Sequence, residues 1–414
     1  MKLKVTKKAV SQFLVLLPFL LIFTGSVFQN TYKIITTLCK LAGFSYMIFY
    51  VISSGKVNKN LIYVTIPFIP LLMYGILNSF SIKAGIADGL RYLFPIVILH
   101  YGYAIKEHFG LLLKFVIAFV VLNFLVQIVN YANWLRGVNQ WFYYTTEDGF
   151  IHFNQTAGIM RATGTVVFFG FFGFFNMIAF FLINKFYQGP YKRFFLGISL
   201  FGLAASLSYK AFGAFFIVLI IYYYKHIYKV LASILILLLV IFISFPDKIN
   251  TFGEDIILRL SLYVTKGDSA RSESYRVMFN EIADFNLFGR GVGVFGGPAS
   301  TDYGSTFYKL VSFNWYDTKW LNLATTDTYL PHLFVELGLV GGFSYLLILI
   351  TPLLRKKINQ KYIIVAVIYF CLCFDMLFSF SLNNLEYLLF SLVFVYPIYY
   401  YENNNFKVTN KGVE

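Results

Sequence analysis

The segment VSQFLVLLPFLLIFTGSVFQ, residues 10–29, decides the fold, because its twenty residues carry no charged side chain. A helix of about 20 apolar residues spans the roughly 30 Å hydrocarbon core of a bilayer. Similar runs recur along the chain, and each is continuous rather than alternating, which predicts helices and not the strands of a barrel. The preceding MKLKVTKK resembles the start of a signal peptide. No clear small-residue cleavage site follows, so we expect an uncleaved first span.

Composition excludes an ordinary water-soluble domain. Of the 414 residues, 58% are hydrophobic and 13% are charged, and the mean hydropathy is +0.69. Soluble domains hold roughly 25% charged residues. The three cysteines, Cys39, Cys371 and Cys373, lie inside apolar runs, so no disulfide framework is predicted. We therefore expect an all-α polytopic membrane protein in which residues 1–414 form a single integral membrane domain.

About twelve transmembrane helices are predicted from the apolar runs. They lie approximately at residues 10–29, 34–53, 61–78, 86–105, 110–130, 165–184, 194–209, 211–224, 230–245, 328–352, 362–381 and 385–401.

Basic residues gather in alternate connections, which predicts the orientation of the chain. With the N-terminus inside, every inner connection holds Lys or Arg, whereas the short outer connections hold few. The basic residues of the inner segments are Lys2, Lys4, Lys7, Lys8, Lys56, Lys59, Lys106, Lys185, Lys192, Arg193, Lys225, Lys229, Arg355, Lys356, Lys357, Lys361, Lys407 and Lys411. Both termini are therefore predicted to be cytoplasmic. Most of the net charge of +15 then faces anionic lipid, so nucleic acid is not an expected partner.

Two predicted outer connections are long. The shorter one covers residues 131–164, and the longer one covers residues 246–326, between the ninth and tenth spans. Connections of this length are unusual and often functional. We expect the longer one to be an ordered cap with short helices, including one near 272–285.

Basic side chains at the outer face could bind an anionic substrate. Arginine matches phosphate oxygens with two parallel hydrogen bonds, and several cations on one face could hold a pyrophosphate. The candidates are Arg161, Lys210, Arg271, Arg276 and Arg290. The alternative is structural: the arginines would reach lipid headgroups or pair with Glu273 or Glu281, and the lysine would belong to an ordinary turn.

Three ionisable residues precede or enter the tenth predicted span from outside: Asp327, His332 and Glu336. His332 and Glu336 are four residues apart, so they share a helical face. A histidine or a carboxylate can take a proton from a sugar hydroxyl, and a second carboxylate can orient the base. The alternative is an Asp327 or Thr328 cap with a structural His–Glu pair. Ionisable groups near a span are costly, which favours the functional interpretation.

Other motifs carry less chemistry. The segment GRGVGVFGG, residues 289–297, is not followed by the GKS or GKT of a nucleotide-binding loop, and a flexible hairpin turn explains it. The histidines show no metal-ligand spacing. We therefore expect a metal-independent protein with no cofactor.

Four segments together resemble the Wzy-type polysaccharide polymerases and the related O-antigen ligases. They are RATGT at 161–165, LSYKAFGAFF at 207–216, ARSESYR followed by NLFGRGVGVFG at 270–296, and DTYLPHLFVELGLVGG at 327–342. The second segment has Lys210 where the family has arginine. In ligases a histidine opens the last motif, where this chain has Thr326 and Asp327, and His332 falls later. That departure favours a polymerase.

The resemblance implies a membrane glycosyltransferase of the cytoplasmic membrane. It would polymerise undecaprenyl-pyrophosphate-linked repeat units at the outer face, for capsule, exopolysaccharide or O-antigen. Arg161, Lys210, Arg271, Arg276 and Arg290 would bind pyrophosphate, and the membrane lipids, a flippase and a chain-length regulator would be its partners. Two alternatives are an O-antigen-ligase-like transferase and a lipid-linked oligosaccharide flippase or transporter. A flippase is expected to carry charges within its spans and to lack a long outer connection, so the connection at 246–326 argues against it. A transporter is expected to have broken helices in paired halves, which the sequence does not indicate.

Overall fold

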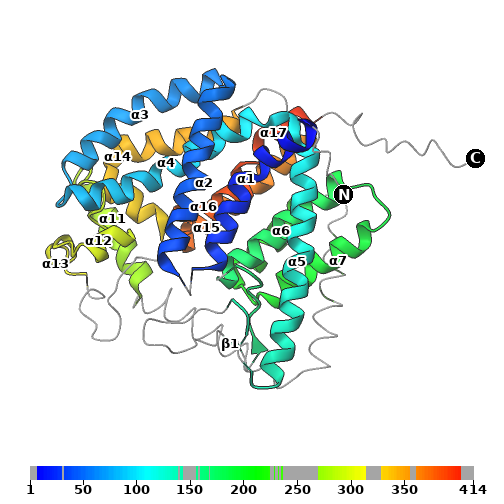
Figure 1. Cartoon of the computed structure of the whole chain (residues 1–414). Coiled ribbons are helices and arrows are strands. Elements are labelled where there is room, and N and C mark those ends of the chain that lie inside the picture. Colours follow the sequence, from blue (N-terminus) through cyan, green and yellow to red (C-terminus); the bar gives the residue numbers. More distant parts are fainter. Residues whose placement is uncertain are drawn as a thin grey trace, which may run out of the picture.

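The computed structural model describes residues 7–29, 32–138, 140–142, 155–156, 159–166, 168–223, 269–313, 328–354 and 360–401, with residues 228, 232 and 235 in addition. The described chain is almost entirely helical (Figure 1), which confirms the predicted all-α class. Its one strand pair joins β1 (Gln155–Thr156) to β2 (Ile159–Met160) in antiparallel register.

The helices follow the predicted spans closely in the N-terminal half. They are α1 (Lys7–Val27), α2 (Lys33–Ser54), α3 (Lys59–Leu77), α4 (Ile82–Ala104), η1 (Lys106–His108), α5 (Phe109–Leu135), α6 (Phe169–Phe186), α7 (Lys192–Ala205) and α8 (Tyr209–Tyr222). The later ones are α11 (Ala270–Ala283), α12 (Pro298–Asp302), α13 (Phe307–Leu310), α14 (Tyr329–Ile350), η4 (Thr351–Leu353), α15 (Gln360–Phe378), η5 (Ser381–Asn383), α16 (Leu385–Leu392) and α17 (Val395–Tyr400).

Seven described helices are long and apolar enough to cross a membrane: α1, α2, α3, α5, α6, α14 and α15. Helix α4 has the length but carries Lys83, Asp88 and Arg91. Helices α7 and α8 have 14 residues each, and α16 with α17 forms a shorter apolar stretch. The predicted span at 230–245 lies outside the described residues. Membrane-spanning helices are thus supported at seven predicted positions, while twelve spans and their orientation stay predictions.

Local sequence sets several helix boundaries. Helix α2 ends at Gly55, whose φ of 61° is a left-handed conformation that glycine adopts without strain. The side chains of Asn58 and Ser208 accept backbone hydrogen bonds at the starts of α3 and α8. Ser269 and Ser272 form a reciprocal capping box at the start of α11. These polar residues end the apolar runs and so separate one helix from the next.

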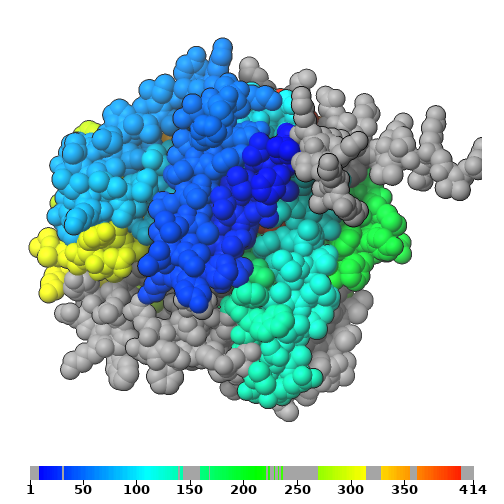
Figure 2. Space-filling model, in the orientation of Figure 1, coloured from blue at the N-terminus to red at the C-terminus, as the bar shows by residue number. Residues whose placement is uncertain are grey.

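Aromatic side chains pack between helices, and large apolar side chains also cover the outside. Phe119, Phe175 and Phe390 come from three helices, and their ring centroids lie 4.6–5.9 Å apart. On the outward side of α2, Ile34 and Ile52 are 77% and 74% exposed. Figure 2 shows parts of α1, α2 and α3 on one broad face, where α1 and α2 lie next to each other. Large exposed apolar side chains on such a face fit an apolar solvent, as a bilayer provides.

The short helices of the long connection pack onto α14. Val277 of α11 is buried in one apolar cluster with Phe295, Phe334 and Val335. Figure 1 places α11, α12, α13 and β1 toward the lower end of the helices. The helix expected near 272–285 is therefore present at 270–283, and it contacts the membrane-spanning helix that carries His332.

Candidate functional site

Helix α14 is broken at Gly338, whose φ of 66° and ψ of −170° are not helical. The segment 286–291 lies against the break and pairs with its backbone. The four hydrogen bonds, 2.9–3.1 Å long, run from Leu339 N to Asn286 O, from Val340 N to Leu287 O, from Arg290 N to Val335 O and from Gly291 N to Glu336 O. Broken helices are tolerated at membrane depth where protein satisfies the freed backbone groups. We did not predict this break from the sequence, where the expectation concerned only broken helices in paired halves.

Two glycines permit this close pairing. A Cβ atom on Gly289 would lie 2.1 Å from the carbonyl oxygen of Glu336, and one on Gly338 would lie 2.3 Å from the nitrogen of Gly289. Both residues also have positive φ. The interpretation of GRGVGVFGG as a flexible turn was therefore wrong, because this segment is a packed part of the α14 break.

The same glycine-rich segment holds the buried pair His332 and Glu336, which the sequence placed on one helical face. Both side chains are fully buried, and His332 Nδ1 lies 3.5 Å from Glu336 Oε1. The N–H of Phe295 donates to Glu336 Oε1 at 3.0 Å, and the hydroxyl of Tyr92 donates to Glu336 Oε2 at 3.1 Å. The Tyr92 ring stacks on His332 with centroids 5.2 Å apart. These contacts fix the positions of the His332 and Glu336 side chains.

The tautomer of His332 follows from its partner. Nδ1 lies 2.7 Å from the carbonyl oxygen of Phe295. A carbonyl only accepts hydrogen bonds, so Nδ1 carries the proton. In the neutral ring Nε2 then holds the free lone pair, and this buried atom has no hydrogen-bond partner in the described part of the chain. Nε2 is the atom that could accept a proton from a substrate.

Sequence analysis missed the charged residues of α4 beside this pair. Asp88 is fully buried and forms an ion pair with Arg91 one turn later. A Cβ on Gly297 would touch both Asp88 Oδ2 and His332 Cε1, which places the carboxylate next to the imidazole. The signal that could have found them is an acid and a base inside a predicted span, because such residues are costly in a bilayer.

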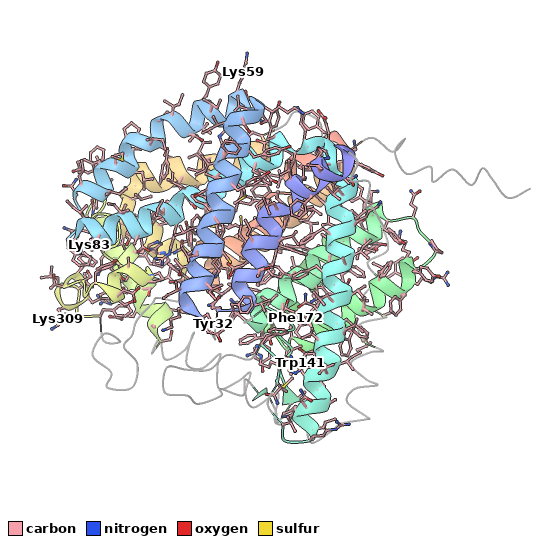
Figure 3. All side chains as sticks on the ribbon, viewed as in Figure 1. Tyr32, Lys59, Lys83, Trp141, Phe172 and Lys309 are labelled. Carbon is pink, nitrogen blue, oxygen red and sulfur yellow. The ribbon has the colours of Figure 1, made fainter. Side chains whose placement is uncertain are left out.

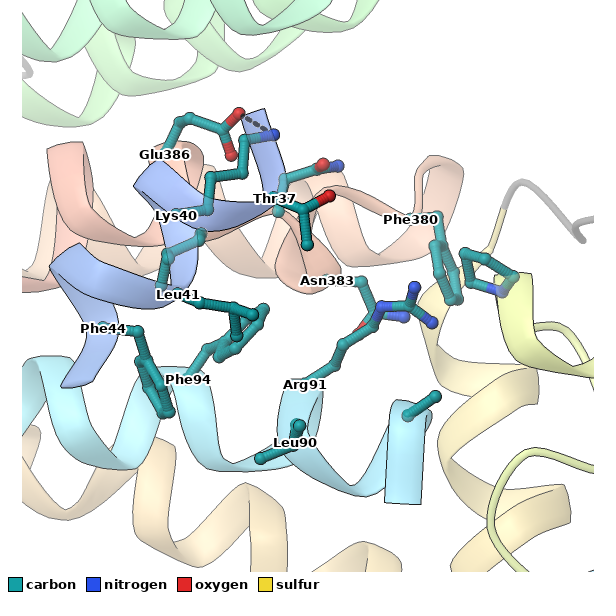
Figure 4. Close-up of a pocket in the computed structure, with 14 residues that line it drawn as sticks. Thr37, Lys40, Leu41, Phe44, Leu90, Arg91, Phe94, Phe380, Asn383 and Glu386 are labelled. Atoms are coloured by element: carbon teal, nitrogen blue, oxygen red, sulfur yellow. Dashed lines mark ion pairs between the residues drawn. The ribbon is translucent and has the colours of Figure 1, made fainter. Parts of the chain in front are cut away.

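Arg91 also lines a cavity of about 400 Å³ between α2, α4, η5 and α16. Figure 4 shows Lys40 and Glu386 toward one end of this cavity and Arg91, Asn383 and Phe380 toward the other. Lys40 Nζ pairs with Glu386 Oε1 at 2.6 Å. The sequence analysis singled out none of these residues, because they lie far apart in the chain. Lys40 and Glu386, which form an ion pair, are 346 positions apart.

Arg161 is the first residue of the RATGT segment, which polar side chains of α5 hold by hydrogen bonds. Gln127 Oε1 accepts the N–H groups of Thr163 and Gly164 at 3.1 and 3.0 Å. Arg161 is buried and donates to the carbonyl oxygen of Leu207 at 2.7 Å, in the turn before α8. Its guanidinium also lies 3.2 Å from the ring centroid of Phe169. The segment therefore connects α5 to the α7–α8 turn.

Lys210 of α8 and Tyr275 of α11 both contact the last part of α15. Lys210 Nζ lies 3.3 Å from Oδ1 of the buried Asp375. Tyr275 of α11 donates to the carbonyl oxygen of Leu377 at 2.9 Å, and burial raises the pKa of Tyr275 to about 12, which keeps this donor protonated. Arg271 precedes Tyr275 by four residues, so it emerges from the same side of α11. The structure thus places Lys210 beside α15, and Arg271 in a helix that contacts the end of α15 through Tyr275.

Arg276 and Arg290 instead form ion pairs with Glu273 and Glu281, which was the structural alternative to binding an anion. Arg276 donates to Glu273 at 2.5 Å and to the carbonyl oxygen of Val311 at 2.8 Å. Arg290 Nε lies 2.9 Å from Glu281 Oε2. Each arginine is thereby paired with an acid of α11.

Asp327 lies outside the described residues. Thr328 occupies the N-cap position of α14, and its side chain makes no capping hydrogen bond, so of the two predicted caps Thr328 is wrong and Asp327 stays a prediction. Within the described residues, no group of three or more His, Cys, Asp or Glu side chains is arranged to hold a metal ion.

No protein-family model matches this chain, and no curated protein matches it significantly in sequence. The functional interpretation therefore rests on the residues and their geometry.

Proposed function

We propose that this protein is a membrane glycosyltransferase that polymerises lipid-pyrophosphate-linked oligosaccharide repeat units at the outer face of the cytoplasmic membrane. The observation that carries the proposal is His332: a buried imidazole whose Nδ1 proton is held by the carbonyl oxygen of Phe295 and whose Nε2 has no hydrogen-bond partner in the described part of the chain. The order of the four short segments that resemble Wzy-type polymerases supports the same function. The cell's polysaccharide, a flippase and a chain-length regulator would be the functional partners.

In the proposed reaction, a hydroxyl oxygen of the incoming unit attacks the anomeric carbon of the growing chain. The bond from that carbon to the pyrophosphate oxygen breaks, and its electron pair leaves with the lipid pyrophosphate. The hydroxyl proton passes to His332 Nε2, while Glu336 holds the Phe295 segment that orients the ring. Asp327, two residues before α14, is the other candidate base.

Cations would stabilise the negative charge that grows on the departing pyrophosphate. Arg161 and Arg271 are the proposed group. Lys210 begins α8 beside the turn that Arg161 contacts, but it pairs with the buried Asp375 and would bind pyrophosphate only by giving up that partner. Arg276 and Arg290 are assigned to holding α11, since each already pairs with an acid of that helix.

The test compares two arginines of one helix, in cells that make the polymer and carry only the variant protein. His332→Asn and Arg271→Ala are expected to abolish long-chain polymer and leave single units on the outer surface. Arg276→Ala is the matched control and is expected to keep long chains. The readouts are a glycan ladder and the membrane level of each variant. Normal chain length in both His332→Asn and Arg271→Ala would refute the proposal.

A flippase is the second candidate, and one observation favours it. A flippase is expected to carry charges within its helices, and Asp88, Asp375 and Glu386 are buried in α4, α15 and α16. The same experiment separates the two functions. Loss of a flippase would leave lipid-linked units on the inner leaflet, where a membrane-impermeant glycan-oxidising reagent does not reach them, whereas loss of a polymerase would leave single units accessible to it.

A further inference from the structure

We infer that the cavity between α2, α4, η5 and α16 binds a neutral, hydroxyl-rich sugar ring of the acceptor unit, and not the pyrophosphate. This inference rests on the proposed function and names the substrate group that this part of the site takes. The cavity of about 400 Å³ falls within the size range of small-ligand pockets.

The charges of the cavity argue against an anion. Lys40 is paired with Glu386, and Arg91 is paired with Asp88, and both carboxylates are buried. Each cation therefore has its own anion, and a pyrophosphate would have to displace a buried carboxylate that would then lack a partner. Lys40 and Arg91 can donate to a ligand in the cavity and Glu386 can accept, which suits the hydroxyl groups of a sugar.

The side chain of Asn383 points to the same chemistry. It lines the cavity and is 7% exposed, and neither its amide nitrogen nor its amide oxygen has a hydrogen-bond partner in the described chain. Buried amides are almost always hydrogen-bonded. A ligand that satisfies both atoms must donate and accept, as neighbouring sugar hydroxyls do.

Aromatic rings supply the apolar part of the wall. Phe44 and Phe94 lie with centroids 5.0 Å apart, and Phe380 lines the cavity farther along (Figure 4). The C–H face of a pyranose can pack on such rings while its hydroxyls turn to the ion pairs. Phe380 also contacts His332, with ring centroids 5.0 Å apart. A sugar in the cavity is therefore separated from the proposed base by one side chain.

The rim of the cavity is apolar and faces outward. Leu41 of α2 and Leu90 of α4 both line the cavity and are 45% and 38% exposed. Ile86, one turn before Leu90, is exposed as well. An opening between apolar helix faces fits a substrate that enters sideways from the bilayer with its lipid tail outside.

The test is binding to the purified full-length protein in detergent. The probe is a fluorescently labelled oligosaccharide released from the cell's own surface polymer by partial acid hydrolysis. Ala87→Trp narrows the rim, Asn383→Ala removes the amide, and Ile86→Trp is the matched control on the adjacent, outward position. We expect the first two variants to weaken binding about tenfold or more, and the control to match the wild-type protein.

The outcomes separate this inference from the proposed function. Absence of probe binding to the wild-type protein, or equal binding by all three variants, overturns the sugar site. Binding of inorganic pyrophosphate that is lost in Ala87→Trp overturns it too, since the cavity would then be an anion site. Loss of polymer in His332→Asn cells is measured independently, so the polymerase proposal can survive failure of the sugar site, and probe binding can survive failure of the polymerase proposal.

Discussion

At the scale of single residues, the buried polar groups fall into two sets. Glu336 accepts hydrogen bonds on both oxygens, whereas the amide of Asn383 and Nε2 of His332 have no partner in the described chain. An unsatisfied buried polar group costs about 1–3 kcal/mol. Such groups persist in sites where a ligand supplies the missing bonds, at a cost in stability.

This argument predicts that Asn383→Ala stabilises the free protein. Removing the unpaired amide removes its desolvation cost, against which a small loss of packing must be set, so we expect a gain of about 1 kcal/mol. The thermal unfolding midpoint in detergent measures it. A clear fall in that midpoint would mean that Asn383 stabilises the fold and that its amide is satisfied.

A second residue-scale prediction distinguishes a structural role of Lys210 from a role in binding pyrophosphate. Removing one partner of a buried ion pair costs about 3–5 kcal/mol, so Lys210→Met is expected to lower both stability and polymer length. The double variant Lys210→Met/Asp375→Leu removes both charges and should recover most of the stability. If Lys210 binds pyrophosphate, polymer length stays low in the double variant. Recovery of long chains would assign Lys210 a structural role.

Sequence could place His332 and Glu336 on one face because a helix fixes the geometry of residues four apart. It could not pair them with Tyr92 and Phe295, which are 244 and 41 positions from Glu336. Such contacts depend on how whole helices pack, which hydropathy does not encode. The same reason explains why the sequence offered Glu273 and Glu281 as acid partners of the arginines but could not assign them to Arg276 and Arg290.

At the scale of secondary structure, hydropathy and length predicted most helices within a few residues, because a span must bury about 20 apolar residues whatever its neighbours are. They did not predict the break in α14, since GLVGG reads as an ordinary apolar run. The break needs a second segment, 286–291, to pair with it, and that partner lies about 50 residues away.

The break predicts unequal effects of two glycine substitutions. Gly338→Ala adds a methyl group 2.3 Å from the nitrogen of Gly289 at a positive φ, so we expect a loss of about 2–4 kcal/mol. Gly197→Ala in α7 is the control, because nothing lies within 4 Å of its Cβ position and alanine favours a helix by about 1 kcal/mol. Thermal unfolding in detergent compares them. Equal midpoints would mean that segment 286–291 does not pair with α14 in the protein.

At the scale of the whole molecule, the proposed reaction requires α11–α13 and the cavity rim to lie at the outer half of the membrane. The basic connections place Lys59 inside, and the long connection that contains Lys309 outside. Both lysines are exposed, and Figure 3 shows Lys59 at the top of the molecule and Lys309 toward the lower end.

Cysteine labelling tests this orientation. In a variant with Cys39, Cys371 and Cys373 replaced by alanine, a membrane-impermeant maleimide should label Lys309→Cys in intact cells. It should label Lys59→Cys only after permeabilisation, because the reagent does not cross the bilayer. A membrane-permeant maleimide, which should label both positions in intact cells, is the control for reactivity. The reverse pattern would place α11–α13 in the cytoplasm, and His332, held by Phe295 of that connection, could then not serve a polymerase at the outer face.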